Sequence, residues 1–247
     1  LCEGADIVVE NFKPGTLERW GLGFEDLKTA NPGLIMVRIS GFGQDGPHSD
    51  RGGYGVVCEA VSGLREITGE PDRPPPRVTT PLTDYIAGLY AAFGAMMALH
   101  ERGETGLGQV VDSALYEGSF SFMEPHVPAF AQLGKIAQRA GSKLPGSTPN
   151  SLYETFDGKH IVITTASDSV FRRLATAMGA PELQADPRFV TARDRVANSD
   201  ACEALVVAWA AGHDLAYLEK TRADQPVPAS PTHTSPSYPS DPCACPV

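Results

Sequence analysis

The amino-acid sequence predicts an α/β protein, with a partial Rossmann-like large domain and a smaller α+β domain. In the first part of the chain, strand-like apolar runs alternate with helical patterns, as at residues 5–9 and 34–40. This alternation is typical of a sheet covered by helices. Later, a turn at Asp157-Gly158 and one strand-like run at 160–165 are followed by helical patterns, which indicates a second unit.

Four segments of different composition divide the chain. We expect residues 1–124 to form part of the large domain, and residues 125–150, an irregular stretch, to connect it to the next. Residues 151–225 are expected to form the small α+β domain. Residues 226–247 are rich in Pro, Ser and Thr, a composition that cannot pack a core, so we expect a disordered tail there.

The elements of both domains follow from local patterns. Turn signals at Pro14-Gly15 and Asn31-Pro32-Gly33 bound the first helical region. The expected strands are 5–9, 34–40 and 160–165. The expected helices are 16–22, 24–30, 54–64, 84–102, 111–124, 168–178, 198–211 and 214–223. The helix at 84–102 is rich in Ala and Gly, so other backbone can approach it closely.

The overall charge of the chain indicates which classes of macromolecule it can bind. The 247 residues include 20 Lys and Arg against 30 Asp and Glu, for a net charge of −10, without a basic run. This balance argues against nucleic acid as the partner. We find no apolar stretch near the roughly 18 residues that span a membrane, and no signal-peptide pattern at the start. The sequence therefore predicts a cytoplasmic protein that does not bind membranes.

The cysteines and histidines give no metal signature. The five cysteines have no repeated spacing, and no two of the six histidines lie four residues apart on a helical stretch. Cys243-Ala244-Cys245 is too short for the usual zinc-binding pair. We expect neither a disulfide framework nor a metal site.

Asp84 stands where a Pro-rich loop runs into the expected helix at 84–102. A carboxylate at that place lies against the positive end of the helix dipole, which keeps it ionised and able to attack an electrophile. Asp and Thr are also the residues preferred at a helix N-cap, so Asp84 or Thr83 can equally be a simple cap. The local pattern leaves both interpretations open.

Four short motifs, one of which contains Asp84, occur in series. They are Val9-Glu10-Asn11-Phe12-Lys13-Pro14-Gly15, Ile39-Ser40-Gly41-Phe42-Gly43-Gln44-Asp45-Gly46-Pro47, Arg51-Gly52-Gly53-Tyr54 and Pro81-Leu82-Thr83-Asp84 with Ala87-Gly88. In this order and at these separations they resemble the family III CoA-transferases, including the formyl-CoA and carnitine CoA-transferases. The resemblance covers about residues 1–222 and implies the fold of that family.

The resemblance implies that Asp84 is the catalytic nucleophile. In that family the aspartate attacks the thioester of an acyl-CoA and forms an aspartyl anhydride, then an aspartyl-CoA thioester. A carboxylic acid acceptor takes the CoA by the reverse steps, so the thioester energy is kept in covalent form. The implied substrates are an acyl-CoA and a small carboxylic acid. Coenzyme A is thus a substrate, and no permanently bound cofactor is expected.

The same resemblance assigns five further residues to the CoA site. Asn11 and Phe12 match family contacts to CoA, and Lys13 lies where the chain passes that ligand. Arg19 matches a family arginine that contacts CoA, although an Arg on a helix can simply be solvated. Tyr54 matches a family tyrosine near the thioester, although an aromatic residue after Gly-Gly is often the first core residue of a helix.

The chain also departs from the family pattern. Many members have Asp and Gln where this chain has Gly55 and Glu59, which changes the charge beside the implied pocket. Members carry an upstream nucleotide-fold region and a different downstream segment. We therefore expect this sequence to be a fragment that lacks the N-terminal region and has an atypical C-terminal tail. The family's interlocked homodimer is implied for the full-length protein.

Two alternatives to CoA transfer remain open at the level of sequence. The α-methylacyl-CoA racemases share the fold, but they need an acid/base pair. Their histidine aligns with Tyr54, and His48 lies six residues too early, so transfer is favoured. The other alternative is an inactive truncated fragment.

Overall fold

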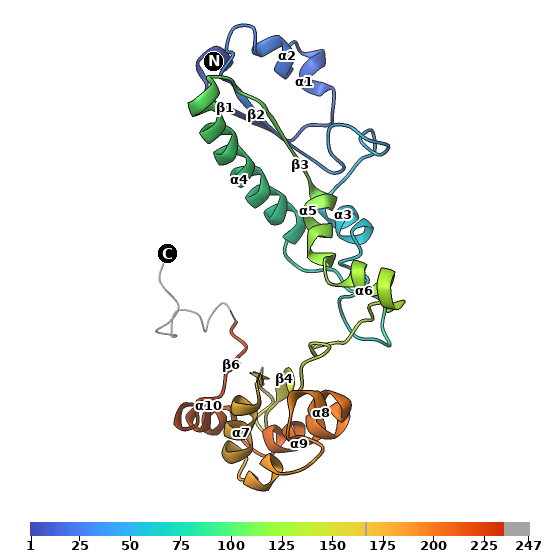
Figure 1. Ribbon diagram of the computed structural model, residues 1–247, viewed down its shortest axis with the longest axis vertical. Helices are drawn as coiled ribbons and strands as arrows, with labels where there is room; N and C mark the ends of the chain where they lie inside the picture. Colours follow the sequence, from blue (N-terminus) through green and yellow to red (C-terminus); the bar gives the residue numbers. More distant parts are fainter. Residues whose placement is uncertain (166, 235–247) are drawn as a thin grey trace. The chain divides into compact units, whose positions relative to one another are not determined.

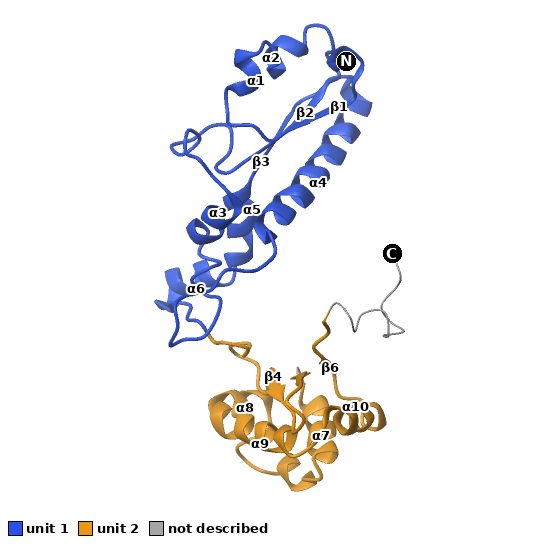
Figure 2. Ribbon diagram, turned by 180° about the vertical axis from the view of Figure 1, so that it is seen from behind, with its two compact units in different colours: residues 1–139 blue, residues 140–247 orange. Residues whose placement is uncertain are grey.

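The computed structural model describes residues 1–165 and 167–234. The chain divides into two compact units, residues 1–139 and residues 140–247, shown in different colours in Figure 2. Both units combine helices with a sheet, which confirms the predicted α/β class. Residues 235–247, most of the expected tail, lie outside the described part of the chain.

A three-stranded parallel sheet organises the first unit. Its strands are β1 (Ile7–Glu10), β2 (Ile35–Ser40) and β3 (Val110–Ala114), with β2 in the centre. In a parallel sheet all strands end at the same edge, and ligands of open α/β sheets bind outside that edge. The last residues of β1, β2 and β3 therefore define where a site can form.

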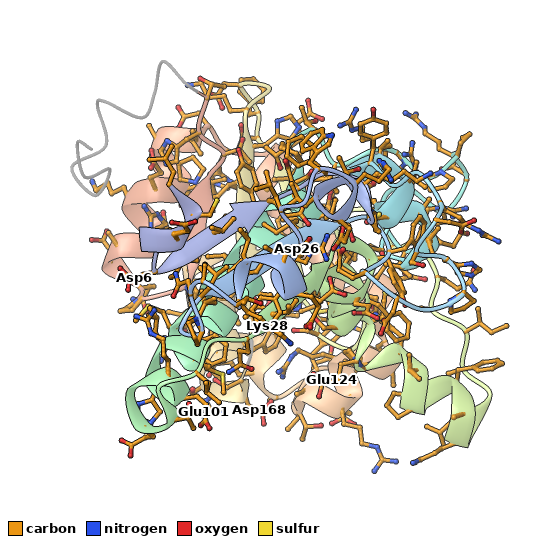
Figure 3. The ribbon with its side chains drawn as sticks, turned by 90° about the horizontal axis from the view of Figure 1, so that it is seen from above. Asp6, Asp26, Lys28, Glu101, Glu124 and Asp168 are labelled. Atoms are coloured by element: carbon orange, nitrogen blue, oxygen red, sulfur yellow. The ribbon has the colours of Figure 1, made fainter. Side chains whose placement is uncertain are left out.

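Helices cover both faces of this sheet (Figure 1). On one face, α4 (Leu82–Thr105) packs its small side chains against β2, in a cluster of Ile35, Val37, Ala91, Ala95 and Ala98. On the other face, α1 (Thr16–Arg19) and α2 (Phe24–Leu27) form a cluster with β2 that contains Leu17, Leu34, Met36, Phe24 and Leu27. At the start of α2, Asp26 accepts a hydrogen bond from Gly23 N at 3.2 Å, and Figure 3 labels this residue.

The small residues of α4 allow close packing on the sheet. A Cβ atom at Gly94 would lie 2.6 Å from Cγ1 of Val111 on β3. Ser113 of β3 donates a hydrogen bond of 3.0 Å to the carbonyl oxygen of Ala87, which joins β3 to the early part of α4. By length and composition alone α4 could also span a membrane, but its buried alanines belong to the core of the first unit.

Two short 3₁₀ helices also belong to the first unit. They are η1 at Cys2–Gly4 and η2 at Ser121–Met123. The remaining helices of this unit are α3 (Gly55–Val61), α5 (Leu115–Phe120) and α6 (His126–Leu133). Cys58, Ala87 and Leu115 form one buried cluster, which joins α3, α4 and α5.

The predicted helix at 111–124 is wrong in its first part. Residues Val110–Ala114 form β3 instead, because Val110 and Val111 pair with Met36 and Val37 and thereby complete the sheet. Helix begins only at Leu115. The stretch from 125 to 150, expected to be irregular, contains α6, an eight-residue helix.

The second unit is built on an antiparallel sheet. Its strands are β4 (Asn150–Glu154), β5 (His160–Thr164) and β6 (Ala229–Pro231), with β5 in the centre. The helical elements are α7 (Asp168–Ala177), η3 (Pro181–Gln184), α8 (Ala192–Ala197), α9 (Ser199–Ala211) and α10 (Leu215–Asp224). The core contains Tyr153, Ile161, Ile163, Leu174 and Val206.

The expected disorder of the tail is wrong for its first residues. Ala229 and Ser230 pair with Ile163 and Val162 of β5, so β6 is an edge strand of the sheet. Proline is compatible with an edge strand because one side of that strand needs no hydrogen-bond partner. Arg222 of α10 donates a hydrogen bond of 2.7 Å to Ala229 O. This bond joins β6 to α10.

Candidate active site

A pocket of about 340 Å³ opens in the first unit, next to the end of β2. It contains groups from four chain segments that are far apart in the sequence. These are the loop after β1, the end of β2 with the glycine-rich loop behind it, the start of α4, and the start of α5. The lining residues are Asn11, Phe12, Lys13, Pro14, Ile39, Ser40, Gly41, Phe42, Ser49, Arg51, Gly52, Gly53, Tyr54, Asp84 and Leu115.

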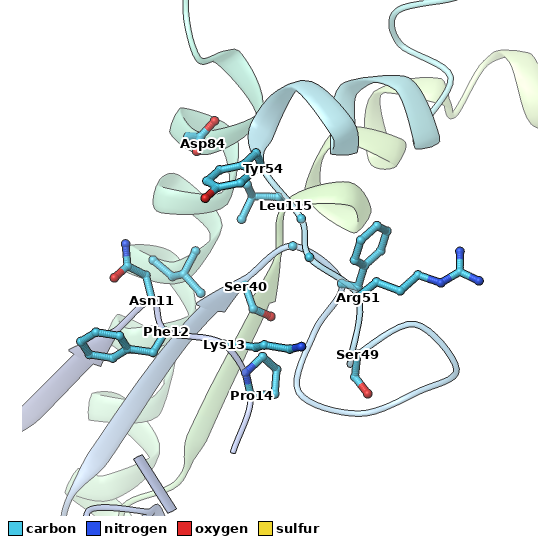
Figure 4. A pocket seen from close by; sticks show the side chains of 15 residues that line it. Asn11, Phe12, Lys13, Pro14, Ser40, Ser49, Arg51, Tyr54, Asp84 and Leu115 are labelled. Carbon is cyan, nitrogen blue, oxygen red and sulfur yellow. The ribbon is translucent and has the colours of Figure 1, made fainter. Parts of the chain in front are cut away.

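Asp84 contributes the carboxylate of this pocket (Figure 4). It lies in the first turn of α4, two residues after the helix starts at Leu82. The residue before the helix is Pro81 and no side chain caps the helix start, so of the two open interpretations the simple cap by Asp84 or Thr83 is wrong. The carboxylate is instead exposed, and Thr83 Oγ1 donates a hydrogen bond of 3.2 Å to Asp84 Oδ2. The N-terminal end of a 24-residue helix and this hydroxyl both lie beside the carboxylate.

Gly55 gives the Asp84 carboxylate its place. A Cβ atom at Gly55 would lie 2.0 Å from Asp84 Oδ2 and 2.6 Å from Thr83 Oγ1, so no larger residue fits without displacing them. The departure from the family pattern at Gly55 thus has a direct structural consequence. It leaves room for the carboxylate at the first residue of α3.

A second close approach forms the floor of the pocket. A Cβ atom at Gly41 would lie 2.5 Å from the Cα atom of Gly53, so the two loops touch through their backbones. Cys58 of α3 donates a hydrogen bond from Sγ to Gly41 O at 3.3 Å. These contacts bring the end of β2 next to α3, and hence next to Asp84.

The loop after β1 supplies three of the residues predicted to contact CoA. Asn11, Phe12 and Lys13 all line the pocket and are exposed. The Phe12 ring packs edge-on against Trp20, with 5.3 Å between the ring centroids. In Figure 4 the Phe12 ring points away from Lys13, whose side chain extends toward the glycine-rich loop.

Tyr54 also lines the pocket, directly before α3. Its side chain is 81% exposed, so the alternative of a core residue is wrong. Figure 4 shows its ring beside Asp84. A phenol at this position is available to a ligand that approaches the carboxylate.

Arg19 is the one predicted site residue that the structure does not bring to this pocket. It ends α1, is exposed, and donates a hydrogen bond of 3.0 Å to Thr16 Oγ1. Its contact with CoA stays a prediction that rests on the resemblance alone.

Sequence reasoning assigned no role to several residues of the pocket. Arg51 stood in a quoted motif, and its guanidinium has no ion-pair partner among residues 1–165 and 167–234. Ser40 ends β2, and its buried hydroxyl has no partner in the described part of the chain. The glycines next to Arg51 and Ser40 are the feature of the sequence that could have identified them. Glycines allow two backbone segments to approach closely, and the side chains beside them then lie near one another.

Within the described residues, no group of three or more His, Cys, Asp or Glu side chains is placed to hold a metal ion.

Comparison with known proteins identifies the family. The sequence model of the family described as "CoA-transferase family III" matches residues 1–243 of this chain. The chain belongs to CoA-transferase family III.

Two curated family III relatives and one solved structure illustrate the similarity. Succinyl-CoA–D-citramalate CoA-transferase of Chloroflexus aurantiacus is 46% identical over 242 residues, 98% of this chain and 60% of that protein. Acetyl-CoA:oxalate CoA-transferase of Acetobacter aceti is 39% identical over 205 residues, 83% of this chain and 52% of that protein. The crystal structure of a CAIB/BAIF family protein from Brucella suis has a TM-score of 0.83 at 35% identity, and covers 98% of this chain and 64% of that one.

These findings confirm the predicted family and its fold. The family III chain spans about 60% of the length of the first relative.

The position of His48 gives no support to racemisation. His48 is not among the residues that line the pocket. Its ring packs edge-on against Phe42, with Nδ1 3.1 Å from Pro47 O. The acid/base pair that racemisation needs is therefore not formed by His48 and Asp84 in this family III chain.

Cys58 lies under the pocket as a protonated thiol. Burial, followed by the nearby negative charge of Asp84, raises the pKa of Cys58 to about 11. It therefore acts as a buried packing residue and hydrogen-bond donor, rather than as a nucleophile.

We predict that Cys58 resists alkylation in the folded chain. At about pH 8, iodoacetamide is expected to modify Cys58 more than about tenfold more slowly than the half-buried Cys2, because only a thiolate reacts. Mass spectrometry of the two peptides over time gives both rates. Unfolding in guanidinium is the control and should make the rates similar. Equal rates in the folded protein would contradict the assignment.

Proposed function

We propose that the intact enzyme transfers coenzyme A from an acyl-CoA donor to a carboxylic acid, with Asp84 as the covalent nucleophile. The observation that carries this proposal is the exposed Asp84 carboxylate in the pocket that also contains Asn11, Phe12, Lys13 and Tyr54. Membership of CoA-transferase family III supports the reaction class. In this proposal residues 1–124 form part of the large domain, which contains the catalytic residue, and residues 151–225 form the small domain.

In the first half of the reaction, Asp84 takes the CoA. A carboxylate oxygen of Asp84 attacks the thioester carbonyl, the C–S bond breaks, and an anhydride and the CoA thiolate form. The thiolate then attacks the aspartyl carbonyl carbon of the anhydride. The C–O bond breaks, the donor acid leaves as a carboxylate, and an aspartyl-CoA thioester remains.

In the second half, the acceptor takes the CoA from Asp84. The acceptor carboxylate attacks the aspartyl thioester, which releases the thiolate and forms a second anhydride. The thiolate attacks the acceptor's carbonyl carbon and regenerates the Asp84 carboxylate. No proton or electron is gained or lost overall, so no further cofactor is needed. Water must be excluded while the anhydrides exist.

We infer that the acceptor or the donor acyl group is a dicarboxylic acid. The two relatives described above are named for succinyl-CoA with D-citramalate and for acetyl-CoA with oxalate, and succinate, citramalate and oxalate are dicarboxylates. The pocket of this chain is lined by two cations, Lys13 and Arg51, beside a single carboxylate, Asp84. A surplus of positive charge favours a ligand that carries more than one anionic group.

The decisive experiment is a panel of acyl-CoA donors and carboxylic acid acceptors with the full-length gene product. We expect transfer with at least one dicarboxylic partner, and loss of kcat by at least about a thousandfold in Asp84→Ala. Mass spectrometry of the Asp84 peptide should detect the CoA adduct. Asp45→Ala is the matched control, since Asp45 is exposed nearby and does not line the pocket.

Two results would overturn this proposal. One is full activity in Asp84→Ala. The other is exchange of the α-proton of an acyl-CoA in heavy water without any acceptor acid, which would indicate a racemase.

Gly55→Ala tests the geometry around the nucleophile. The new methyl group would overlap Asp84 Oδ2, so we expect kcat to fall by about a hundredfold while the protein stays folded. Gly88→Ala is the control, because Gly88 lies on α4, the helix of Asp84, and a Cβ atom there meets nothing within 4 Å. Rates from a single donor and acceptor pair are sufficient. Equal rates for the two variants would show that the carboxylate does not depend on this contact.

We also infer that the full-length enzyme is a homodimer in the cytoplasm. Large apolar side chains of α4 are exposed, with Leu89 at 73%, Phe93 at 65% and Met97 at 59%, and contiguous exposed apolar surface marks an interface. The cysteines of the described chain, Cys2, Cys58 and Cys202, are free thiols, which suits a reducing compartment.

The dimer can be tested by light scattering after size exclusion. We expect the full-length product to have twice the mass of one chain, and Phe93→Asp to shift it toward the monomer or toward aggregates. Glu101→Gln is the control, since Glu101 is an exposed charged residue of the same helix. A monomeric wild type would contradict the proposed dimer.

A further inference from the structure

A row of three charged residues crosses the first sheet near the carboxyl ends of its strands. Glu10 of β1 pairs in register with Arg38 of β2, and Arg38 pairs in register with Asp112 of β3. Side chains of paired residues lie on the same face of a sheet, so the three charges are neighbours. Glu10 and Arg38 are buried, with exposed fractions of 5% and 7%.

Arg38 is the centre of this row and has two carboxylate partners. Its Nε donates a hydrogen bond of 2.6 Å to Glu10 Oε1, and Nη1 and Nη2 donate to the two oxygens of Glu18 at 2.6 and 3.2 Å. The guanidinium hydrogen bond to Glu18 lowers the pKa of that carboxyl. Because Glu18 belongs to α1, Arg38 also joins that helix to the sheet.

Each carboxylate of the row holds one loop of the pocket. The second oxygen of Glu10 accepts a hydrogen bond of 2.8 Å from the backbone N–H of Phe12. Asp112 Oδ2 accepts one of 2.6 Å from Gln44 N, in the glycine-rich loop. These bonds fix the backbone next to Asn11 and Lys13 and next to Phe42, which line the pocket. Glu10, Arg38 and Asp112 do not line it themselves.

A purely structural role would not require charges at this place. A buried ion pair contributes little net stability compared with well-packed apolar residues, because removing two charges from water is costly. What the charges supply is direction, since bidentate guanidinium and carboxylate bonds have strict geometry. The arrangement therefore suits a function that depends on the position of a loop.

We propose that Arg38 is a positioning residue for the CoA thioester. It acts through Glu10, which holds the Asn11–Lys13 loop in its ligand-binding position, while Asp112 holds the glycine-rich loop in the same way. Arg38 does not touch the ligand. This inference rests on the proposed function, because it assumes that the pocket receives CoA.

The expected effect of Arg38→Met is selective for binding. Without the guanidinium, the Glu10 carboxylate loses its orientation and the loop of Phe12 loses its fixed position. We expect KM for the acyl-CoA to rise about tenfold with kcat within about threefold of wild type, since these loops bind ground state and transition state alike. The dissociation constant of free CoA should rise by a similar factor.

The experiment uses the full-length gene product and compares four variants with wild type. Arg38→Lys should recover part of the lost affinity, because an ammonium keeps a positive charge near Glu10 but cannot form the two-bond pair that Arg38 makes with Glu18. Arg102→Met is the matched control. It also removes an arginine that pairs with a carboxylate, Asp6 at 2.9 Å, but Asp6 directly precedes β1 and so lies where that strand begins, away from the edge with the pocket.

The fourth variant, Asp112→Ala, guards against misfolding of Arg38→Met. Asp112 lies on an edge strand, so its loss should be tolerated while Gln44 N loses its acceptor. If Arg38→Met does not yield folded protein, a raised CoA dissociation constant in Asp112→Ala supports the proposal and an unchanged one overturns it. If Arg38→Met folds, unchanged KM and unchanged CoA affinity overturn it.

Calorimetry with free CoA separates this inference from the proposed function. A wild type that binds CoA but transfers it to no acceptor would contradict the transferase proposal alone, and the binding constants of the variants would still decide the role of Arg38. A fall in kcat without any change in CoA affinity would show that Arg38 acts on the reacting groups, and would also overturn the positioning role.

Discussion

The candidate site depends on one steric constraint, the absence of side chains at Gly41, Gly53 and Gly55. The loop after β2 touches the loop before α3 because neither Gly41 nor Gly53 has a Cβ atom. The Asp84 carboxylate occupies the space that a side chain at Gly55 would take. Glycine makes such backbone approaches possible at the expense of conformational entropy. The pocket is therefore formed by backbone proximity, and its side chains are placed as a result.

The parallel sheet brings segments that are distant in the sequence together at this site. Because β1, β2 and β3 run in the same direction, the loops that follow β1 and β2 emerge at one edge. The α4 helix packs on the same sheet, and Ser113 of β3 is hydrogen-bonded to it beside Ala87. The start of α4, and Asp84 with it, is thus held at the edge where the loops emerge. Polar bonds from Glu10 and Asp112 then fix the loops themselves.

Local signals in the sequence predicted the parts of the site that use special residues. Asp84, Tyr54 and the Asn11–Lys13 loop lie in motifs with Gly and Pro, and all of them line one pocket. The predictions failed where only pairing with distant residues decides the structure. Val110 and Val111 suit a helix or a strand, and only β2 as a neighbour makes them a strand. The strand β6 likewise forms because residues of the Pro-rich segment pair with β5, a partner that is distant in the sequence.

The capping and catalytic interpretations of Asp84 are separated by where α4 begins. A cap must precede the helix and accept the first free N–H groups, but Asp84 lies inside the first turn and caps nothing. Its carboxylate therefore accepts one hydrogen bond, from Thr83 to Oδ2, and makes no capping bond to the backbone. The helix dipole stabilises the charge without occupying a lone pair, whereas a capping bond would use one. Pro81 is the residue directly before the helix, and α4 begins at Leu82, two residues earlier than the pattern predicts.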